Sequence, residues 1–195
     1  MCRWAAYRGT PLFLEDIIAA PRHSLIAQSQ GARHAASPTH GDGFGVAWYG
    51  ERPEPGLYRD VLPAWADRNL ASLSHQIRSG LFLAHVRAST GTATSRANCH
   101  PFSHGNWLFM HNGQIGGYER IRRKLEALID DRFYSARVGT TDSELIFYLL
   151  FSEGLEQDPM RALTSSVGKI ERLAKGEGIN EPFKFTAVLS DGETI

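Results

Sequence analysis

The chain has 195 residues, 42% of them hydrophobic, and its 21 Lys and Arg residues balance its 21 Asp and Glu residues. This length and apolar content predict a single α/β domain over residues 1–195, and the balanced charge gives no electrostatic basis for nucleic acid or an anionic membrane as a partner. The sequence has no apolar run near the ~20 residues of a membrane span, no signal-peptide pattern and only two cysteines, so we expect a cytoplasmic protein without a disulfide framework.

Strands dominate the first half of the predicted fold. Val46 and Trp48 alternate with Ala47 and Tyr49 behind a glycine-rich loop, and this period of two is typical of a β-strand. In chain order the patterns predict a strand at 2–7, a helix opened by Pro11 at 11–20, a loop and strand within 38–50, a partner strand at 57–62, a helix at 67–79, and strands at 81–90 and 106–113.

Helices dominate the second half. An amphipathic helix is predicted at 118–131, a helix that is apolar on nearly all sides and therefore buried at 140–154, and a further helix at 160–173. The last strand, within 183–195, ends in a turn motif that no partner strand follows, so we expect the sequence to be truncated at its C-terminal end. The hairpin spacing of the strands favours antiparallel sheets covered by helices.

Cys2 directly follows the initiator methionine in the opening "MCRWAAY". Removal of Met1 would give Cys2 both a thiol and a free α-amino group, and an adjacent base activates a thiol as a nucleophile. An α-amino group with a pKa of ~7.7–8.0 is partly unprotonated near neutral pH, so it can serve as that base. The alternative is a buried structural cysteine, which is the commoner role of this residue type.

The stretch "FMHNGQIGG" places Asn112 and Gly113 directly after an apolar strand. Attack on an amide carbonyl creates an oxyanion, which the side-chain amide of Asn112 and the backbone N–H of Gly113 could stabilise. The alternative is a hairpin turn, because Asn-Gly is a strong turn signal.

Two charged residues have the chemistry to bind an α-amino acid. Arg87 follows an apolar strand in "HVRAST", and its planar guanidinium suits a carboxylate; the alternative is a surface salt bridge. Asp142 in "TTDSE" could bind an ammonium group. Thr141 and Glu144 have the spacing of a capping box, so Asp142 could instead favour only the positive N-terminus of a helix.

The histidines do not predict a metal site. His85, His100 and His111 match no zinc-binding spacing, so we expect no metal or other cofactor, and we expect His85 and His111 to orient strand ends through hydrogen bonds. The glycine-rich "GDGFG" precedes a strand and has no lysine, which argues against a phosphate-binding loop.

Taken together, "MCRWAAY", "HGDGFGVAWY", "HVRAST", "NCHPF", "FMHNGQI" and "TDSELIFYLL" occur in the order found in the type II glutamine amidotransferases of the N-terminal nucleophile hydrolase superfamily. The chain resembles this family over nearly its whole length, and most closely its small single-domain members, which include γ-glutamyl hydrolases. The resemblance implies an α+β fold, a four-layer αββα sandwich of two antiparallel sheets between helical layers. It also implies that no metal or organic cofactor is needed.

The resemblance also implies a role for each site residue. In the family pattern the matching residues are a nucleophile whose own amine is the base (Cys2), an oxyanion pair (Asn112 and Gly113), a carboxylate-binding arginine (Arg87), a pocket threonine (Thr90) and an ammonium-binding acid (Asp142). One departure is that Gly91 stands where many larger members have a histidine, which puts the local pocket contacts in question.

The implied substrate is glutamine or another γ-glutamyl small molecule. No synthetase or isomerase domain is recognised in these residues, so either a partner protein accepts the ammonia or water is the only acceptor and the chain is a γ-glutamyl amidohydrolase. Two rival hypotheses remain: a Cys–His hydrolase or acyltransferase that uses Cys99 with His100 or His111, and a non-catalytic γ-glutamyl-binding module.

Overall fold

The fold is described from a computed structural model, which covers residues 2–31, 39–89 and 93–195. The chain forms two compact units. The first, here called the two-sheet unit, runs to His111 and also includes Ala187–Ile195; the second, the helical unit, is Asn112–Thr186. The expectation of one domain over residues 1–195 stays a prediction.

The two-sheet unit contains two antiparallel sheets. The first has the strand order β1-β4-β2-β3, built from β1 (Arg3–Phe13), β4 (Arg78–Val86), β2 (Phe44–Trp48) and β3 (Gly56–Asp60). The second has the order β5-β6-β7, built from β5 (Phe102–His104), β6 (Trp107–His111) and β7 (Ala187–Ser190). The expected antiparallel pairing is confirmed.

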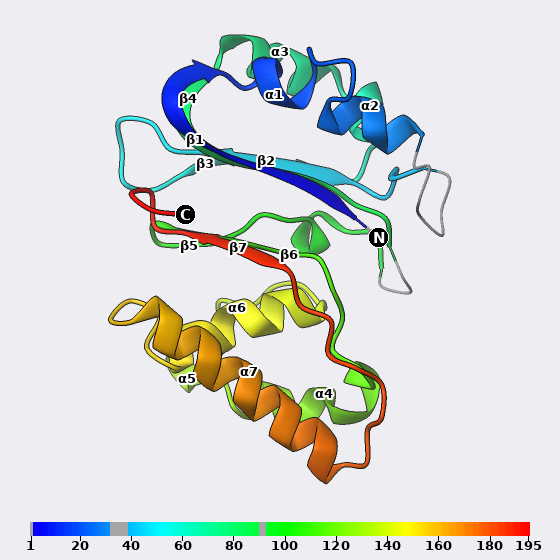
Figure 1. Ribbon diagram of the computed structural model, residues 1–195, viewed down its shortest axis with the longest axis vertical. Coiled ribbons are helices and arrows are strands. Elements are labelled where there is room, and N and C mark those ends of the chain that lie inside the picture. The colour runs from blue at the N-terminus through cyan, green and yellow to red at the C-terminus, as the bar shows by residue number, and fades with distance from the viewer. Residues whose placement is uncertain (1, 32–38, 90–92) are drawn as a thin grey trace. The chain divides into compact units, whose positions relative to one another are not determined.

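Helices cover one face of the first sheet, and the second sheet lies on its other face (Figure 1). The helices of this unit are α1 (Glu15–Ile18), α2 (Leu25–Gln30) and α3 (Arg68–Gln76), with short 3₁₀ turns η1 (Ala64–Ala66) and η2 (Arg96–Asn98).

The predicted alternation in β2 is the basis of this layering. Val46 belongs to the apolar core that also holds Leu14 and Phe82, whereas Ala47 and Tyr49 belong to a second core with residues of β6 and β7. Successive side chains of a strand point to opposite faces, so β2 contributes to both cores.

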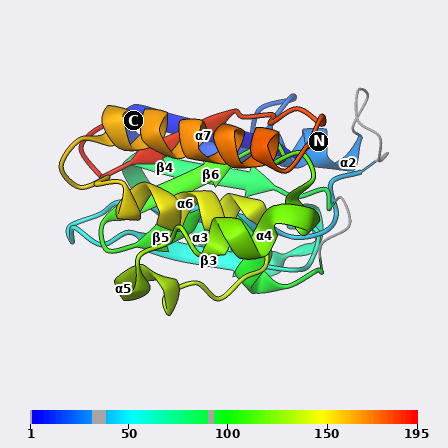
Figure 2. The ribbon, with the colours of Figure 1, turned by 90° about the horizontal axis from the view of Figure 1, so that it is seen from below.

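The helical unit consists of α4 (Tyr118–Glu126), α5 (Asp131–Tyr134), α6 (Asp142–Ser152) and α7 (Pro159–Gly176). Helix α6 packs against each of the other three (Figure 2), and its residues Ser143–Phe151 are all buried. This confirms the buried helix predicted from the nearly continuous apolar sequence. Among the described residues, no helix combines the length and apolarity that crossing a membrane requires.

The predicted start of the first helix is wrong. Pro11 lies within β1, and the helix begins only at Glu15. Because β1 is an edge strand and its register shifts between Arg8 and Leu12, a residue without a backbone N–H is tolerated there.

Candidate active site

Cys2 lies directly before β1, where its thiol contacts the main chain that follows β4. The N–H of Ala88 donates to Sγ at 3.3 Å, and Sγ is 3.4 Å from the Ala88 carbonyl oxygen. The pairing of Arg3 with Val86 brings these segments together. Burial raises the pKa of the Cys2 thiol, and the Ala88 contact and the charge of Arg87 partly oppose that rise. A backbone donor on sulfur favours the thiolate over the thiol, whereas burial, the larger effect here, favours the thiol.

Arg87 lies one residue beyond β4, and only 4% of its surface is exposed. Its guanidinium donates to the carbonyl of Asp42 at 3.2 Å, the hydroxyl of Ser89 at 3.3 Å and the carbonyl of Ala93 at 3.3 Å. Its own N–H donates to the Gly43 carbonyl at 2.8 Å. The alternative of a solvent-exposed surface salt bridge is therefore wrong, because Arg87 is a buried cation fixed by two loops.

Asp42 is a residue that the sequence analysis did not single out. Its carboxylate accepts the N–H of Ser89 at 2.7 Å, and its own N–H donates to the Arg87 carbonyl at 3.1 Å. Asp42 thus joins the glycine-rich loop to the segment that carries Arg87 and contacts Cys2. No local signal reveals this role, because it depends on the pairing of β2 with β4. Thr90 and Gly91 lie outside the described residues, so the substrate contact expected of Thr90 stays a prediction.

Asn112 and Gly113 follow β6 and open the helical unit. The N–H of Asn112 donates to the Thr186 carbonyl at 2.8 Å, and Gln114 and Lys184 exchange two backbone hydrogen bonds at 3.0 Å. The alternative of a two-residue hairpin turn is wrong, because the chain continues past Gly113 toward α4 instead of returning as a strand. The main chain around the expected oxyanion donors is therefore anchored.

Asp142 is the first residue of α6 and does more than favour the helix N-terminus. Thr141 supplies the N-cap, since its side chain accepts the N–H of Glu144 at 3.2 Å. One oxygen of Asp142 accepts the N–H of Ser143 and the other accepts the N–H of Ile115, each at 2.8 Å. Asp142 thus holds the segment that begins at Asn112.

The predicted site residues therefore fall into two groups. Cys2 and Arg87 lie in the two-sheet unit, where the N–H of Ala88, the residue after Arg87, contacts the Cys2 sulfur. Asn112, Gly113 and Asp142 lie in the helical unit.

Two histidines lie deep in the two-sheet unit. The rings of His85 and His100 are 4.4 Å apart between centroids, and both residues are buried. Burial lowers the pKa of His85 to about 3 and lowers that of His100 well below its usual value. Neither ring nitrogen of either residue has a hydrogen-bond partner within the described ranges, so the prediction that His85 orients a strand end through hydrogen bonds is wrong.

Within the described part of the chain, no group of three or more His, Cys, Asp or Glu side chains is arranged to hold a metal ion.

Cys99, the candidate nucleophile of the rival hydrolase, is fully buried. Its thiol contacts the carbonyl oxygens of Asp60 and Ser95, each at 3.5 Å, and burial raises its pKa. Since the ring nitrogens of His100 make no hydrogen bond within the described ranges, Cys99 and His100 do not form a nucleophile–base pair.

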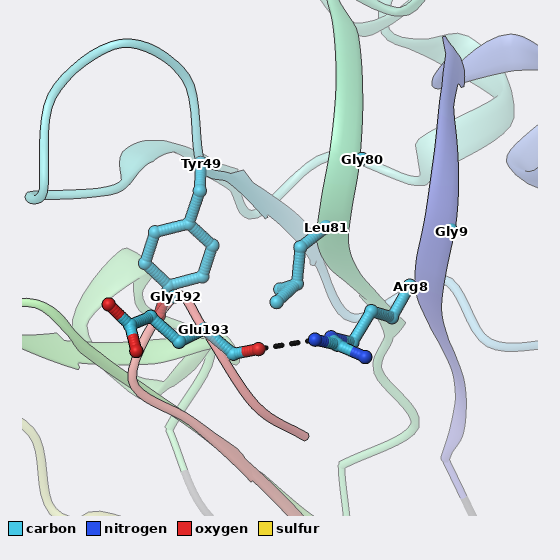
Figure 3. A pocket seen from close by; sticks show the side chains of 7 residues that line it. All are labelled: Arg8, Gly9, Tyr49, Gly80, Leu81, Gly192 and Glu193. Atoms are coloured by element: carbon cyan, nitrogen blue, oxygen red, sulfur yellow. Dashed lines mark hydrogen bonds between the residues drawn. The ribbon is translucent and has the colours of Figure 1, made fainter.

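The two-sheet unit also has an open depression of about 650 Å³ that is lined by residues other than the candidate site residues (Figure 3). Nε of Arg8 donates to the Glu193 carbonyl at 3.0 Å across it. Its lining residues are Arg8, Gly9, Tyr49, Gly80, Leu81, Gly192 and Glu193.

Comparison with known proteins places the sequence beside one family. The sequence profile described as "Glutamine amidotransferases class-II" matches residues 17–195. A yeast protein named "Probable glutamine amidotransferase DUG3", from Saccharomyces cerevisiae, is 40% identical over 222 residues, covering 100% of this chain and 62% of its own length. The chain thus spans less than two thirds of that relative.

Two further proteins, one of them with a solved structure, are similar to this chain. A "Gamma-glutamyl-hercynylcysteine sulfoxide hydrolase" from Mycolicibacterium smegmatis is 32% identical over 180 residues, covering 90% of this chain and 72% of that protein. A solved structure of a glutamine aminotransferase class-II domain protein from Silicibacter pomeroyi is 45% identical with a TM-score of 0.77, covering 98% of this chain and 73% of that one. The expected mixed fold with two antiparallel sheets is confirmed by this likeness.

Proposed function

We propose that this chain, which belongs to the class-II glutamine amidotransferases, hydrolyses the side-chain amide of glutamine or of another γ-glutamyl compound, with Cys2 as its nucleophile. The observation that carries the proposal is the contact of the Cys2 sulfur with the Ala88 N–H at 3.3 Å, beside the buried Arg87. The backbone donor and the nearby Arg87 cation each favour the reactive thiolate, and they partly offset burial, which raises the pKa of the thiol.

The reaction begins once Met1 has been removed, when the α-amino group of Cys2 takes the thiol proton. The thiolate attacks the amide carbon, and a carbon–sulfur bond forms while the carbonyl oxygen becomes an oxyanion. The side chain of Asn112 and the N–H of Gly113 donate to that oxygen. The Cys2 ammonium then protonates the leaving nitrogen, the carbon–nitrogen bond breaks, and a γ-glutamyl thioester remains.

Water hydrolyses this thioester and releases glutamate. The name of the mycobacterial relative describes a γ-glutamyl hydrolase, which supports water as the acceptor and a leaving group larger than ammonia. The alternative is transfer of ammonia to a partner protein, which would also need to bind this chain. We also propose a reducing cytoplasmic setting, in which the Cys2 thiol remains available.

Substrate recognition is proposed to rest on the two charges of the amino acid head. Arg87 binds the α-carboxylate and Asp142 binds the α-ammonium, with Thr90 as a further contact. A desolvated zwitterion needs both charges met, and the two side chains supply opposite signs.

Labelling with a glutamine-like chloroketone tests the nucleophile. We expect one equivalent per chain, mapped by peptide mass to Cys2, and only in molecules whose intact mass shows that Met1 is absent. Cys99→Ser is the matched control and should keep both labelling and turnover, whereas Cys2→Ala should lose both while folding normally. Labelling of Cys99 with Cys2 untouched would overturn the proposal.

A further inference from the structure

Arg137 lies in the helical unit, where its side chain is 6% exposed and contacts three groups on two helices. One terminal nitrogen forms an ion pair with Glu126 in the last turn of α4, and the other donates to the Tyr118 hydroxyl, at the start of α4, at 3.2 Å. Nε lies 3.8 Å from the carboxylate of Glu144 in the first turn of α6, an ion pair that is too long for a hydrogen bond. A planar guanidinium can meet three groups in different directions at once, which a lysine ammonium on a flexible chain cannot reproduce.

These contacts brace both ends of the hydrogen bond between Asp142 and Ile115. On one side, the N–H of Tyr118 donates to the Ile115 carbonyl at 3.2 Å. On the other side, Glu144 lies two residues after Asp142, which accepts the Ile115 N–H at 2.8 Å. Arg137 therefore closes a ring of contacts that runs through the first turn of α6 and the segment before α4.

The charges around Arg137 make its removal consequential. The Glu144 carboxylate accepts the N–H groups of Val138 and Gly139 at 3.1 and 2.7 Å, so it is fixed in place. Burial raises the pKa of Glu126, but the hydrogen bonds from Arg122 and Arg137 lower it overall, so the carboxylate stays charged. Without Arg137, the two carboxylates would lose the cation they share, which would weaken the link between the helix ends that carry them.

We infer that Arg137 is a positioning residue for the proposed amide hydrolysis, because it holds Asp142 against the Ile115 amide and so fixes the segment that begins at Asn112. The inference rests on the proposed function and extends it. Arg137 acts through Asp142 and Ile115 and does not itself contact the reacting atoms.

Arg137→Met, compared with Arg122→Met, tests this role. Arg122 donates to the same Glu126 carboxylate at 2.8 Å, so the control removes an ion pair from the same acid without touching Glu144. We expect Arg137→Met to raise KM for glutamine and to lower kcat/KM by up to about 100-fold, because a misplacement of about 1 Å can cost that much. We expect Arg122→Met to stay within about twofold of the wild type.

The readouts separate positioning from general destabilisation. Rates are expressed per chain that the chloroketone can label, and rejection of N-acetylglutamine is measured as a ratio to glutamine. A purely structural role would lower the melting temperature and the labelled fraction but leave KM and this ratio unchanged, and that result would overturn the inference. Arg137→Lys should recover part of the loss, and Tyr118→Phe should give a smaller change in the same direction; these two variants carry the test if Arg137→Met does not fold.

Hydrogen exchange at the Ile115 amide tests the geometry without activity. Exchange should accelerate in Arg137→Met and Arg137→Lys, with no change in Arg122→Met. If the wild type does not hydrolyse any γ-glutamyl amide, the proposed function fails, while faster Ile115 exchange would still support the bracing by Arg137. Equal Ile115 exchange in all of these variants overturns the inference even if the enzyme is active.

Discussion

At the scale of single residues, main-chain groups contact two of the proposed site residues. The sulfur of Cys2 lies against the N–H of Ala88, and the N–H of Asn112 donates to the Thr186 carbonyl. The Asn112 contact is made by its backbone, so its side chain can be shortened without releasing the segment that carries it. The Cys2 contact is made by the sulfur itself, and a shortened side chain there would keep only the neighbouring pairing of Arg3 with Val86. Variants at Asn112 should therefore report on chemistry more than on folding.

Asn112→Ala should fold normally and turn over slowly. Loss of one oxyanion donor typically lowers kcat by ~10²–10³, and KM should change much less because the charge develops only in the transition state. Steady-state kinetics on glutamine check this, with the exposed Asn69→Ala in α3 as a control that keeps wild-type rates. Wild-type turnover in Asn112→Ala would show that Asn112 has no part in the reaction.

Arg87 should determine selectivity for a free α-carboxylate, and Asp142 should determine selectivity for a free α-ammonium group. The wild type should discriminate strongly against the methyl ester and the N-acetyl derivative of glutamine, because each lacks one charge of the zwitterion. Loss of a buried charge partner typically costs ~2–5 kcal/mol. Arg87→Lys should weaken discrimination against the ester while keeping only part of the wild-type activity, since an ammonium lacks the two-pronged geometry.

Asp142→Asn is the complementary variant. An asparagine oxygen can still accept the Ile115 N–H, so the segment stays anchored while the negative charge is lost. This variant should weaken discrimination against the acetylated substrate and leave discrimination against the ester intact. If either derivative turns over in the wild type as well as glutamine does, the assignment of these two residues to the zwitterion is wrong.

At the scale of elements, the local sequence predicts helices whose residues are nearly all buried and strands whose residues alternate between two faces. Helix α6 is apolar on nearly all sides in the sequence and buried along Ser143–Phe151 in the structure, and β2 alternates between two cores as its sequence does. Pro11 fails as a helix start because its conformation fits an edge strand equally well. Strand order, which decides that β1 is an edge, depends on distant pairing.

For the candidate site, the local sequence predicts the residues but not the contacts that hold them. The sequence alone indicates four candidate site residues, because each lies in a short motif at the end of a helix or strand. They are Cys2, Arg87, Asn112 and Asp142. The contacts that hold them are tertiary: the Ala88 N–H reaches Cys2 through the β1–β4 register, and the Ile115 N–H reaches Asp142 across 27 residues. A motif indicates a candidate side chain but not the backbone group that holds it.

At the scale of the whole molecule, stability should depend on pH through buried histidines. Burial lowers the pKa of His40, His85 and His100 below the ordinary value, in the case of His85 to about 3. The nearby charge of Arg87 also lowers the pKa of His85 and His100. Below about pH 6.5, the unfolded chain therefore binds protons that the folded chain does not, so the free energy of unfolding falls as the pH falls toward 3.

Denaturant unfolding between about pH 7 and about pH 5 measures this effect before carboxylates protonate. Each such histidine should contribute up to ~1.4 kcal/mol per pH unit to the loss of stability. His85→Gln should reduce the slope by one histidine's share whatever it does to stability at pH 7, because glutamine does not titrate. His23→Gln, at an exposed position, is the control and should leave the slope unchanged. If His85→Gln and the wild type lose stability with the same slope, His85 is not buried in its neutral form, and the packing assigned to the His85–His100 pair is wrong.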